Sequence, residues 1–463
     1  MFSKEIYIKR REQLKKFVGD GAILFLGNKE CPMNYSGNSY PFRQDSTFLY
    51  YFGIDRPGMA AIIDVDNNKE TIYGDELTIE DTVWMGKGES LEDICKNAGI
   101  DRVGAYEKVA SDICKLIVKK QKINYLPPYR AENTLQLAFL LDMKYEKVKE
   151  NASEKLIKAV VAQRSVKEKC EIEDMETTMN KVTGPSYIEV MRRIKPGMHE
   201  YNMAGLIEGI ALQNNCSMAY PVICSINGEI LHNHNHGNLM EKGAMLLIDA
   251  GAESPMHYAN DITRTIPVSG TFNAKQKDVY NIVLRAEEKS IESIRPGVPY
   301  QQIHLNAARI ITDGLKALGL MKGNTDDAVA NGAHALFFPH GLGHMLGLDV
   351  HDMEDIGEDF VGYDNEIKRI DQFGTAYLRL GRRLQTGFVL TVEPGIYFIP
   401  VLIEQWNSEG RFRDYINYDR VMNYLDFGGI RIEENVVVTE NSCKIIGNPI
   451  PKDIGEIESL MAE

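Results

Sequence analysis

The stretch Val190–Asn215, VMRRIKPGMHEYNMAGLIEGIALQNN, decides the fold because a later stretch repeats its order of features. Glu292–Gly314 reads ESIRPGVPYQQIHLNAARIITDG, so Ile194–Gly197 is matched one hundred residues later by Ile294–Gly297. In each copy proline ends a helical pattern, because it cannot continue the backbone hydrogen-bond ladder, and a second amphipathic helix follows. Repeats reveal how a fold is assembled, so this pair predicts a duplicated domain.

Apolar strand patterns follow both copies of the repeat. AYPVICS and AMLLIDAGAE come after the first copy, and FVLTVEPGIYF and GGIRIEENVVVTE come after the second. The shared order of elements predicts a catalytic region of two ααββ halves.

Four acidic residues stand where a buried strand would not favour a charge: Asp249, Asp261, Glu393 and Glu433. The loop between Asp249 and Asp261 is short enough for a hairpin. A single carboxylate of this kind is most simply a hydrogen-bonded residue at a strand end. Four together would bury about four negative charges, which is prohibitive without compensation. Two divalent cations would neutralise them.

The segment Pro339–Asp352, PHGLGHMLGLDVHD, contains His340, His344 and His351. His340 and His344 have the spacing of a zinc helix, but Gly341 stands where the HExxH pattern has its glutamate base. Adding His344 to the carboxylates gives a mostly oxygen ligand set that suits Mn²⁺ or a similar first-row ion. Two such ions activate a bridging water without a serine or cysteine nucleophile.

The N-terminal part alternates short apolar segments with turns and helical stretches, and Ser153–Val182 is charged and helical. We expect an N-terminal mixed α/β domain at 1–160 and a catalytic domain at 161–463. The net charge of −14 argues against nucleic-acid binding, which needs a basic face. No apolar run suits a signal peptide or membrane span, and the seven cysteines form no CxxC pair, so we expect a cytoplasmic protein without membrane partners.

The segments LLIDAGAE with NDITRT, HGLGHMLGLDVHD, TVEPGIY and GGIRIEEN resemble, in order, the signatures of the metallopeptidase family of Xaa-Pro aminopeptidase (aminopeptidase P), prolidase and methionine aminopeptidase. The N-terminal YPFRQDSTFLYYFGIDRPG resembles the non-catalytic domain of aminopeptidase P and prolidase. The resemblance implies the "pita-bread" α/β (α+β) fold with two pseudo-symmetric halves. It also implies an Xaa-Pro aminopeptidase acting on Xaa-Pro peptides, with prolidase as the alternative.

The resemblance assigns roles to individual residues. Asp261 and Glu433 match the carboxylates that bridge two metals, Asp249 matches a ligand of one metal, and His344 with Glu393 match ligands of the other. Glu393 also matches the proton-transfer residue. Four further groups match positions near the substrate or behind the ligands, and they complete the predicted catalytic set: His232, His340, His351, and the pair Arg431 and Tyr397. Mn²⁺ is the favoured metal, with Co²⁺, Zn²⁺ or Fe²⁺ as alternatives.

Two features depart from the family pattern. Twelve positions separate Asp249 from Asp261, one more than is typical of the family, and we expect the hairpin turn to absorb the extra residue. The segment 398–427 is long and aromatic, and it could shape the pocket or a subunit contact. Relatives commonly form homo-oligomers, which suggests a dimer or tetramer. A non-catalytic scaffold of the same fold is an alternative that the complete ligand set disfavours.

Overall fold

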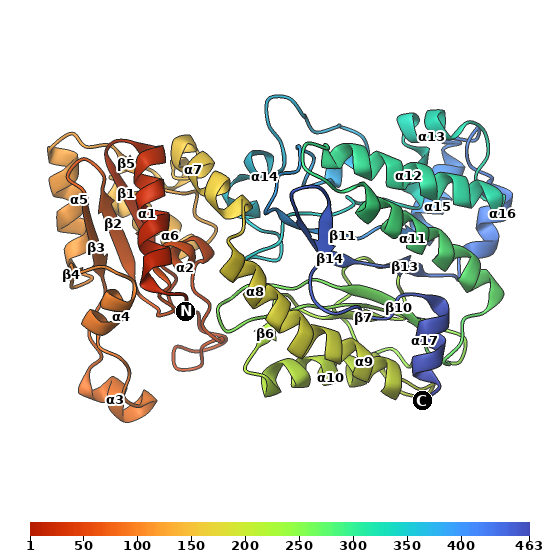
Figure 1. Cartoon of the computed structure of the whole chain (residues 1–463), viewed down its shortest axis with the longest axis horizontal. Helices are drawn as coiled ribbons and strands as arrows, with labels where there is room; N and C mark the ends of the chain where they lie inside the picture. The colour runs from red at the N-terminus through yellow and green to blue at the C-terminus, as the bar shows by residue number, and fades with distance from the viewer. The chain divides into compact units, whose positions relative to one another are not determined.

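The computed structural model describes all 463 residues, which form two compact units (Figure 1). Unit 1 comprises Met1–Arg164 with Met353–Phe360, and unit 2 comprises Ser165–Asp352 with Val361–Glu463. No helix in the chain combines the length and the apolar character that crossing a membrane requires.

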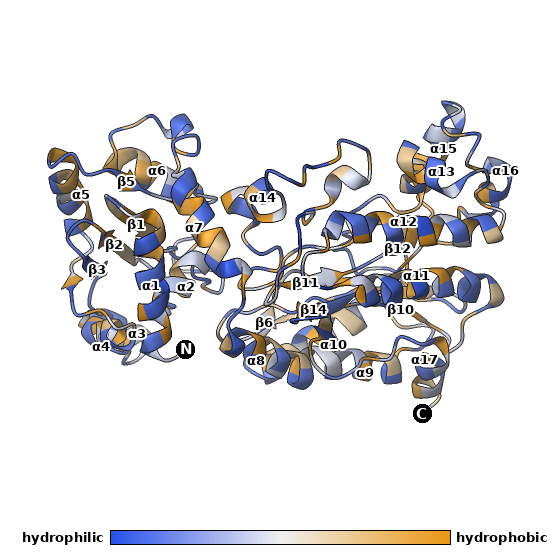
Figure 2. Cartoon of the chain, turned by 45° about the horizontal axis from the view of Figure 1, so that its top comes forward, coloured by the Kyte–Doolittle hydropathy of each residue, from blue (hydrophilic) through white to orange (hydrophobic).

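Unit 1 is built on a five-stranded sheet in the order β4-β3-β2-β1-β5. Strands β1, β2 and β3 are antiparallel neighbours, and the edge strands β5 and β4 run parallel to β1 and β3. The central strands have the sequences AILFL and AAIID, and hydropathy colouring marks them as apolar (Figure 2). The strand bounds are β1 Ala22–Leu26, β2 Ala60–Asp64, β3 Lys69–Tyr73, β4 Val103–Gly104 and β5 Ile123–Asn124.

Helices cover both faces of this sheet because alternate residues of β1 and β2 point to opposite sides. Leu24 and Ile62 pack with residues of α5 and α6 in one apolar cluster. On the other face the Phe25 ring contacts Tyr51 and Phe52 of α2. The helices of this part are α1 Lys4–Val18, α2 Ser46–Phe52, α3 Ile79–Met85, α4 Leu91–Asn97, α5 Lys108–Val118, α6 Ala131–Leu140, the short 3₁₀ turn η1 Tyr145–Lys147, and α7 Glu154–Ser165.

Unit 2 confirms the predicted duplication. Helix α9 (Gly184–Arg193) ends before Ile194 and α10 (Glu200–Gln213) follows, while α11 (Ala274–Ser293) ends before Ile294 and α12 (Tyr300–Ala317) follows. The glycines of the two turns both have positive φ, +93° at Gly197 and +85° at Gly297. Each turn is held by the same kind of backbone bond, from the glycine N–H to Met240 in the first copy and to Leu384 in the second.

Each half then contributes one three-stranded antiparallel sheet, in the order β10-β8-β7 and β11-β14-β15. The strands are β7 Ile223–Ser225, β8 Met245–Asp249, β10 Thr263–Pro267, β11 Val389–Val392, β14 Glu434–Val438 and β15 Cys443–Ile445. Two smaller ladders join β6 (Ser217–Met218) to β9 (Ala252–Glu253) and β12 (Gly395–Tyr397) to β13 (Gly429–Arg431).

The apolar strand predicted to close at Glu393 does end there within one residue, whereas the predicted strand through Arg431 and Glu433 is interrupted at the glutamate. Pro394 has no N–H for a ladder, so β11 ends at Val392 and β12 begins at Gly395. Opposite this break, β13 ends at Arg431 and β14 begins at Glu434. Asp261 likewise precedes β10 by two residues instead of beginning it.

The remaining helices belong to unit 2, except α14, most of which belongs to unit 1. They are α8 Lys169–Thr178, the π-helical turn η2 Met179–Thr183, α13 Thr325–Asn331, η3 Ala333–Leu336, α14 Glu354–Gly362, η4 Thr375–Tyr377, α15 Pro400–Ser408, α16 Tyr418–Val421, η5 Met422–Tyr424 and α17 Ile454–Met461. The aromatic segment 398–427 contributes a few side chains to the core: Trp406 is buried, and the Phe398 ring stacks on Tyr424 with centroids 4.8 Å apart.

Candidate metal centre

Strand register brings the two aspartates together. Strands β8 and β10 form the predicted hairpin, with Asp249 opposite Thr263. Asp261 lies two residues before Thr263, so its side chain is on the same face as Asp249. The hairpin closes at the backbone bond from Ser254 N–H to Tyr258 C=O, and His257 in its three-residue loop has φ +70°. A residue with positive φ is typical of a three-residue hairpin loop.

The two glutamates meet across the second ladder. Val392 pairs with Glu434, and beyond the break Gly395 pairs with Arg431 in the same register. Glu393 therefore lies opposite Glu433. The backbone N–H of Glu433 also donates to the carbonyl of Thr263, which ties this ladder to the hairpin that carries the aspartates.

His344 enters from the irregular segment 339–352, which runs beside β11. Backbone bonds join His344 to Thr391 in both directions, one of them through the Thr391 hydroxyl. The His344 Nδ1 donates to the carbonyl of Met345 at 3.0 Å, an assignment that follows from the carbonyl being an acceptor only. Nε2 is thereby left facing Asp261 Oδ2 and Glu393 Oε1, each at 3.4 Å. In this tautomer the neutral imidazole has a free lone pair on Nε2, which is the arrangement of a histidine that binds a metal ion.

The sequence therefore identified residues that converge at one buried place. Asp261, His344 and Glu433 are all buried, and each offers a ligand atom within 4.8 Å of the others. Asp249 joins them through Tyr220, whose hydroxyl contacts Asp249 Oδ1 at 2.6 Å and also contacts Asp261 Oδ1. Four carboxylates and one imidazole are a hard donor set of the kind that divalent cations accept.

The electrostatics of the cluster are those of a site with excess negative charge. Burial raises the pKa of Glu393 to about 7, and burial likewise raises the pKa values of Asp249 and Glu433. Burial acts in the same direction on Asp261, but the hydrogen bond and charge of His344 outweigh it and lower the Asp261 pKa. His344 has a raised pKa, since these carboxylate contacts overcome the opposing effect of burial. Cations bound among these groups would relieve the repulsion, so the residues present fit a metal centre.

Arg431, Tyr397 and His340 form a chain of hydrogen bonds behind the carboxylates. Arg431 donates from Nη2 to Asp249 Oδ2 at 2.5 Å and from Nη1 to the Tyr397 oxygen at 2.8 Å. The Tyr397 hydroxyl lies 2.9 Å from Nε2 of His340, and Nδ1 of His340 contacts the carbonyl of Gly341 at 2.8 Å. Burial lowers the pKa of His340 to about 3, so this ring is neutral and accepts from Tyr397.

The other two predicted histidines lie at the edge of the cluster. The His351 ring packs edge-on against His344, with centroids 4.4 Å apart. His232 is in the loop after β7 and is substantially exposed. Its pKa is lowered by its partial burial and then by the charge of Arg431, which lies near it. His234 and His236 occupy the same loop, and His236 contacts the backbone carbonyl of Val222.

Sequence analysis missed three residues that hold the candidate ligands. Tyr220 contacts both aspartates, and no pattern around it signals this role. Thr263 donates to Glu433 Oε2 at 2.7 Å and accepts from Arg431 Nε at 3.1 Å. Its position two residues after Asp261 is a signal that period-two reasoning could have used. The Asn435 side chain hydrogen-bonds both the N–H and the C=O of Asp261.

Two parts of the chain match known protein families. Residues 177–440 match the Metallopeptidase family M24, and residues 7–125 match the Aminopeptidase P, N-terminal domain. The chain belongs to metallopeptidase family M24. Among relatives of this M24 protein, the human Xaa-Pro dipeptidase is 34% identical and the match covers 97% of this chain and 91% of that protein. A probable Xaa-Pro aminopeptidase of Aspergillus niger is 30% identical, covering 93% of this chain and 86% of that protein.

Solved structures agree with the fold. Escherichia coli aminopeptidase P in complex with the inhibitor Pro-Leu has a TM-score of 0.81 and 28% identity, covering 100% of this chain and 99% of that one. The zinc-substituted enzyme of the same organism, in complex with product, matches equally well. The predicted fold class and the predicted enzyme class are confirmed, and the scaffold alternative is not needed. Membership of a metallopeptidase family also implies divalent metal ions at the candidate centre.

Proposed function

We propose that this M24 metallopeptidase hydrolyses the peptide bond between an N-terminal residue and a following proline. The observation that carries the proposal is the convergence of Asp249, Asp261, His344, Glu393 and Glu433 from separate segments at one buried place. Divalent cations bound there would lower the pKa of a water between them and provide a hydroxide nucleophile near neutral pH.

The same geometry supports a division of roles among the ligands. Asp261 and Glu433 are proposed to bridge two cations, since both sit beside His344 at the centre of the cluster. Asp249, held by Arg431, is proposed to serve one cation. His344 and Glu393, whose ligand atoms are 3.4 Å apart, are proposed to serve the other. Mn²⁺ is the proposed metal because the donors are oxygen-rich, with Co²⁺, Zn²⁺ and Fe²⁺ as the alternatives to test.

The residues around the ligands are proposed to handle substrate and protons. Glu393 is the proposed proton-transfer group, because its side chain faces both the centre and His340, whose Nδ1 is 3.8 Å from Glu393 Oε2. His340, kept neutral and oriented by Tyr397, is proposed to face the scissile carbonyl. His232 and His351 are proposed to contact substrate from the edge of the site.

Proline specificity is supported by the names of both relatives described above, an Xaa-Pro dipeptidase and a probable Xaa-Pro aminopeptidase. A proline nitrogen has no amide hydrogen, and its ring fixes φ, so a dedicated pocket is physically reasonable. Xaa-Pro dipeptidase activity is the second candidate, favoured by the human dipeptidase at 34% identity over nearly the whole chain.

The experiment that tests the proposal compares three substrates. Chelator-stripped protein, with and without resupplied Mn²⁺, is incubated with an Xaa-Pro dipeptide, an Xaa-Pro-Yaa tripeptide and an Xaa-Ala-Yaa control. Metal-dependent release of the first residue from the tripeptide supports the aminopeptidase. Cleavage of the dipeptide alone supports the dipeptidase, and cleavage of Xaa-Ala-Yaa at an equal rate would contradict proline specificity.

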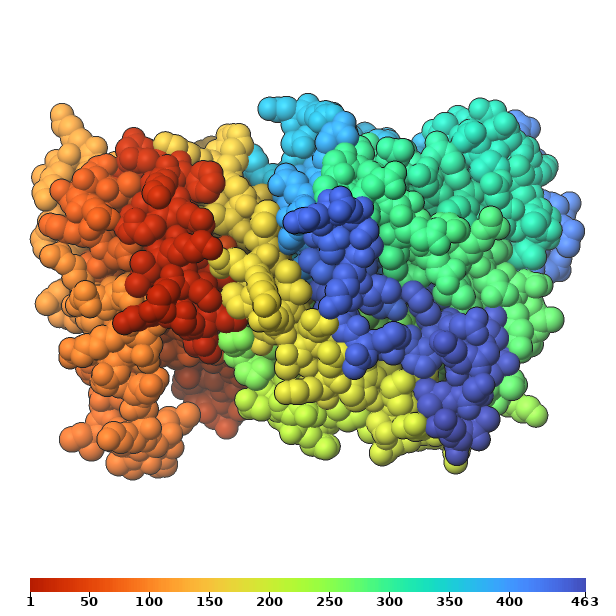
Figure 3. Space-filling model, viewed as in Figure 1, coloured from red at the N-terminus to blue at the C-terminus, as the bar shows by residue number.

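We also propose that the chain forms a homo-oligomer. Helix α3 stands away from the rest of unit 1 (Figure 3) and has no buried residue, although Trp84 is 77% exposed and Met85 is 84% exposed. An exposed apolar group of this kind is typical of an interaction surface, and a second copy of the chain is the proposed partner. Light scattering should give a dimer or tetramer for the parent and a smaller species for Trp84→Asp. A monomeric parent would contradict the proposal.

Two further expectations stay proposals. The division into a non-catalytic part at 1–160 and a catalytic part at 161–463 can be tested by expressing the second part alone. A cytoplasmic location is supported by the seven cysteines, none of which forms a disulfide, because reduced thiols are typical of that compartment. Cell fractionation tests it.

A further inference from the structure

Two hydroxyl side chains outside the candidate centre face the hairpin that carries Asp249 and Asp261. Thr183 closes the π-helical turn η2, and Tyr187 lies four residues later in α9. Residues four apart share one face of a helix, so the two hydroxyls point the same way. A π-helical turn within a longer helix is rare in proteins, and those that occur are often found at functional sites.

Tyr187 joins the two strands immediately after the two aspartates. Its oxygen accepts a hydrogen bond from the N–H of Ala250 at 3.0 Å and donates to the carbonyl of Ile262. Ala250 follows Asp249, and Ile262 follows Asp261. Burial raises the pKa of the Tyr187 hydroxyl well above its usual value, so the group keeps its proton and remains a donor.

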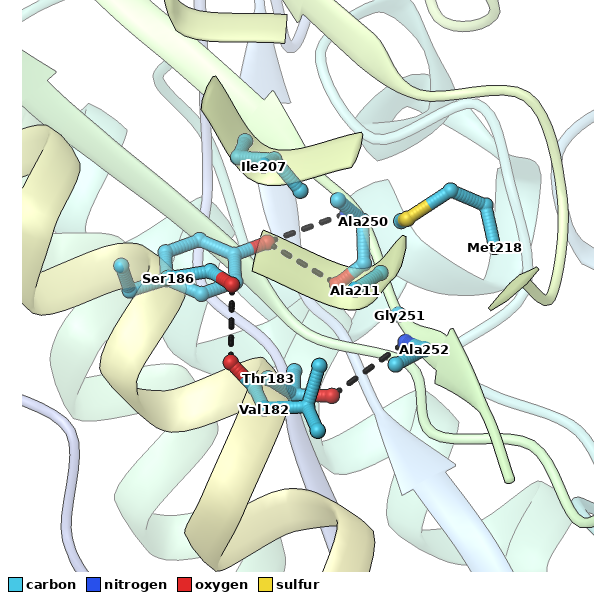
Figure 4. Close-up of a pocket in the computed structure, with 10 residues that line it drawn as sticks. Val182, Thr183, Ser186, Ile207, Ala211, Met218, Ala250, Gly251 and Ala252 are labelled. Atoms are coloured by element: carbon cyan, nitrogen blue, oxygen red, sulfur yellow. Dashed lines mark hydrogen bonds between the residues drawn. The ribbon is translucent and has the colours of Figure 1, made fainter. Parts of the chain in front are cut away.

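Thr183 makes the matching contact on the other side of Asp261. Its hydroxyl accepts from the N–H of Ala252 at 3.2 Å, as Figure 4 shows, and donates to Asn260 Oδ1 at 3.0 Å. Ala252 and Asn260 are themselves paired across the hairpin, as are Ala250 and Ile262. The two hydroxyls therefore bracket the pair of positions that contains Asp261.

Between the hydroxyl contacts at Ala250 and Ala252, the two strands of the hairpin approach each other closely. Gly251 lies opposite Asp261, and a Cβ atom at Gly251 would be 1.7 Å from the carbonyl oxygen of Asn260. Only glycine fits there, so the backbone that carries Asp261 is fixed on one side by this contact and on either flank by a hydroxyl.

Apolar packing accompanies these hydroxyl contacts, because Val182 of η2, Ala211 and Ala252 of the hairpin form one buried apolar cluster. A cavity of about 10 Å³ lies beside them, lined in part by Ile207, Ala211 and Met218 (Figure 4). That volume is about the space of one water, so side chains do not fill the region between the helix and the hairpin completely. The two hydroxyls are polar connections between the hairpin and the helix there, beside the bond that Asn260 Nδ2 donates to the carbonyl of Met175 in α8.

We propose that Tyr187 and Thr183 are positioning residues of the metal centre. By clamping the hairpin on both sides of Asp261, their hydroxyls set the separation of the Asp249 and Asp261 carboxylates that the cations require. The inference rests on the proposed function, and it assigns part of the metal affinity to side chains that touch no ligand oxygen.

The test compares Tyr187→Phe with Tyr280→Phe. Tyr280 is an equally buried tyrosine in α11 whose hydroxyl donates to the carbonyl of Lys452 at 2.8 Å and not to the residues that follow Asp249 and Asp261. Mn²⁺ affinity is measured by competition with a chelator, and hydrolysis of an Xaa-Pro-Yaa tripeptide is followed at limiting and at saturating Mn²⁺. Loss of groups that orient ligands typically weakens metal binding about 10- to 100-fold, and we expect a weakening of about 10-fold for Tyr187→Phe. Activity should recover at saturating Mn²⁺, and Tyr280→Phe should stay within about twofold of the parent in affinity.

A second pair keeps the test decisive if Tyr187→Phe does not fold. Thr183→Val should weaken Mn²⁺ binding, and Thr183→Ser, which retains the hydroxyl, should restore it. Parent affinity in Tyr187→Phe and Thr183→Val would overturn the inference, as would an equal weakening in Tyr280→Phe. A parent protein that binds no divalent cation would instead overturn the proposed function itself, so the two failures are distinguishable.

Discussion

Replacement of Arg431 by methionine should make the protein unusually dependent on metal for its stability. Arg431 is almost fully buried and supplies the cluster with a permanent positive charge through its contact with Asp249. Methionine keeps the length and the apolar part of the side chain but removes the charge. The metal-free variant then holds buried carboxylates that lack this partner.

The magnitude follows from the burial of the pair. Removing one member of a buried ion pair typically costs about 3–5 kcal/mol, because the other charge is left uncompensated. For a unit of this size that corresponds to a fall in Tm of roughly 5–10 °C. Cations bound at the cluster would replace the lost charge, so Mn²⁺ should raise the Tm of Arg431→Met by more than it raises that of the parent. Activity should still fall, because Tyr397 loses the Arg431 donor that orients the hydroxyl it presents to His340.

Thermal unfolding with chelator and with Mn²⁺ measures this effect. The matched control is Lys167→Met, which breaks a second buried pair: the Lys167 and Asp352 side chains are each 1% exposed and 2.7 Å apart, and neither is a candidate ligand. Both variants should be less stable than the parent in chelator. Only Arg431→Met should then gain more Tm from Mn²⁺ than the parent gains. Equal Mn²⁺ stabilisation of the parent and Arg431→Met would refute the reasoning.

Three further predictions concern groups outside the centre. Burial raises the pKa of Glu287 to about 7 despite its contact with Lys452, so its stabilising contribution is present at low pH and is lost as pH rises through 7. Glu287→Gln should remove about 3 kcal/mol of this pH dependence, measured by urea unfolding at pH 5 and 8. Neither ring nitrogen of buried His334 has a partner, and burial lowers its pKa to about 4, so its contribution is lost as pH falls below 6.5. His334→Leu should therefore raise Tm more at pH 5 than at pH 7.5, because it removes a destabilisation of about 2 kcal/mol at pH 5. Gly251→Ala should destabilise by roughly 3 kcal/mol in thermal melts, because the added Cβ meets the Asn260 carbonyl.

Much of the fold was accessible from the sequence because the duplicated features are local. Proline and glycine at Ile194–Gly197 and Ile294–Gly297 end helices through backbone chemistry that does not depend on the rest of the chain. The candidate ligands could also be predicted from local sequence, because a carboxylate within an apolar strand sequence is unusual and needs an explanation.

The parts that sequence reasoning missed depend on tertiary contacts. The strand break at Glu433 arises where two ladders meet, and Tyr220 reaches the aspartates only after the chain has folded. Thr183 and Tyr187 were missed because hydroxyls on a helix facing a hairpin look like ordinary polar residues. Their role can be inferred only when their partners in the hairpin are known.

Titration of Mn²⁺ into chelator-stripped protein, with hydrolysis of an Xaa-Pro-Yaa tripeptide followed at each addition, tests the central claim most directly. The account predicts an inactive stripped protein and full activity at about two equivalents per chain, as expected for a two-metal centre. It also predicts that Asp261→Asn and Glu433→Gln remain folded but gain no activity. Full hydrolysis by the stripped protein, or activity in either variant equal to that of the parent, would contradict it.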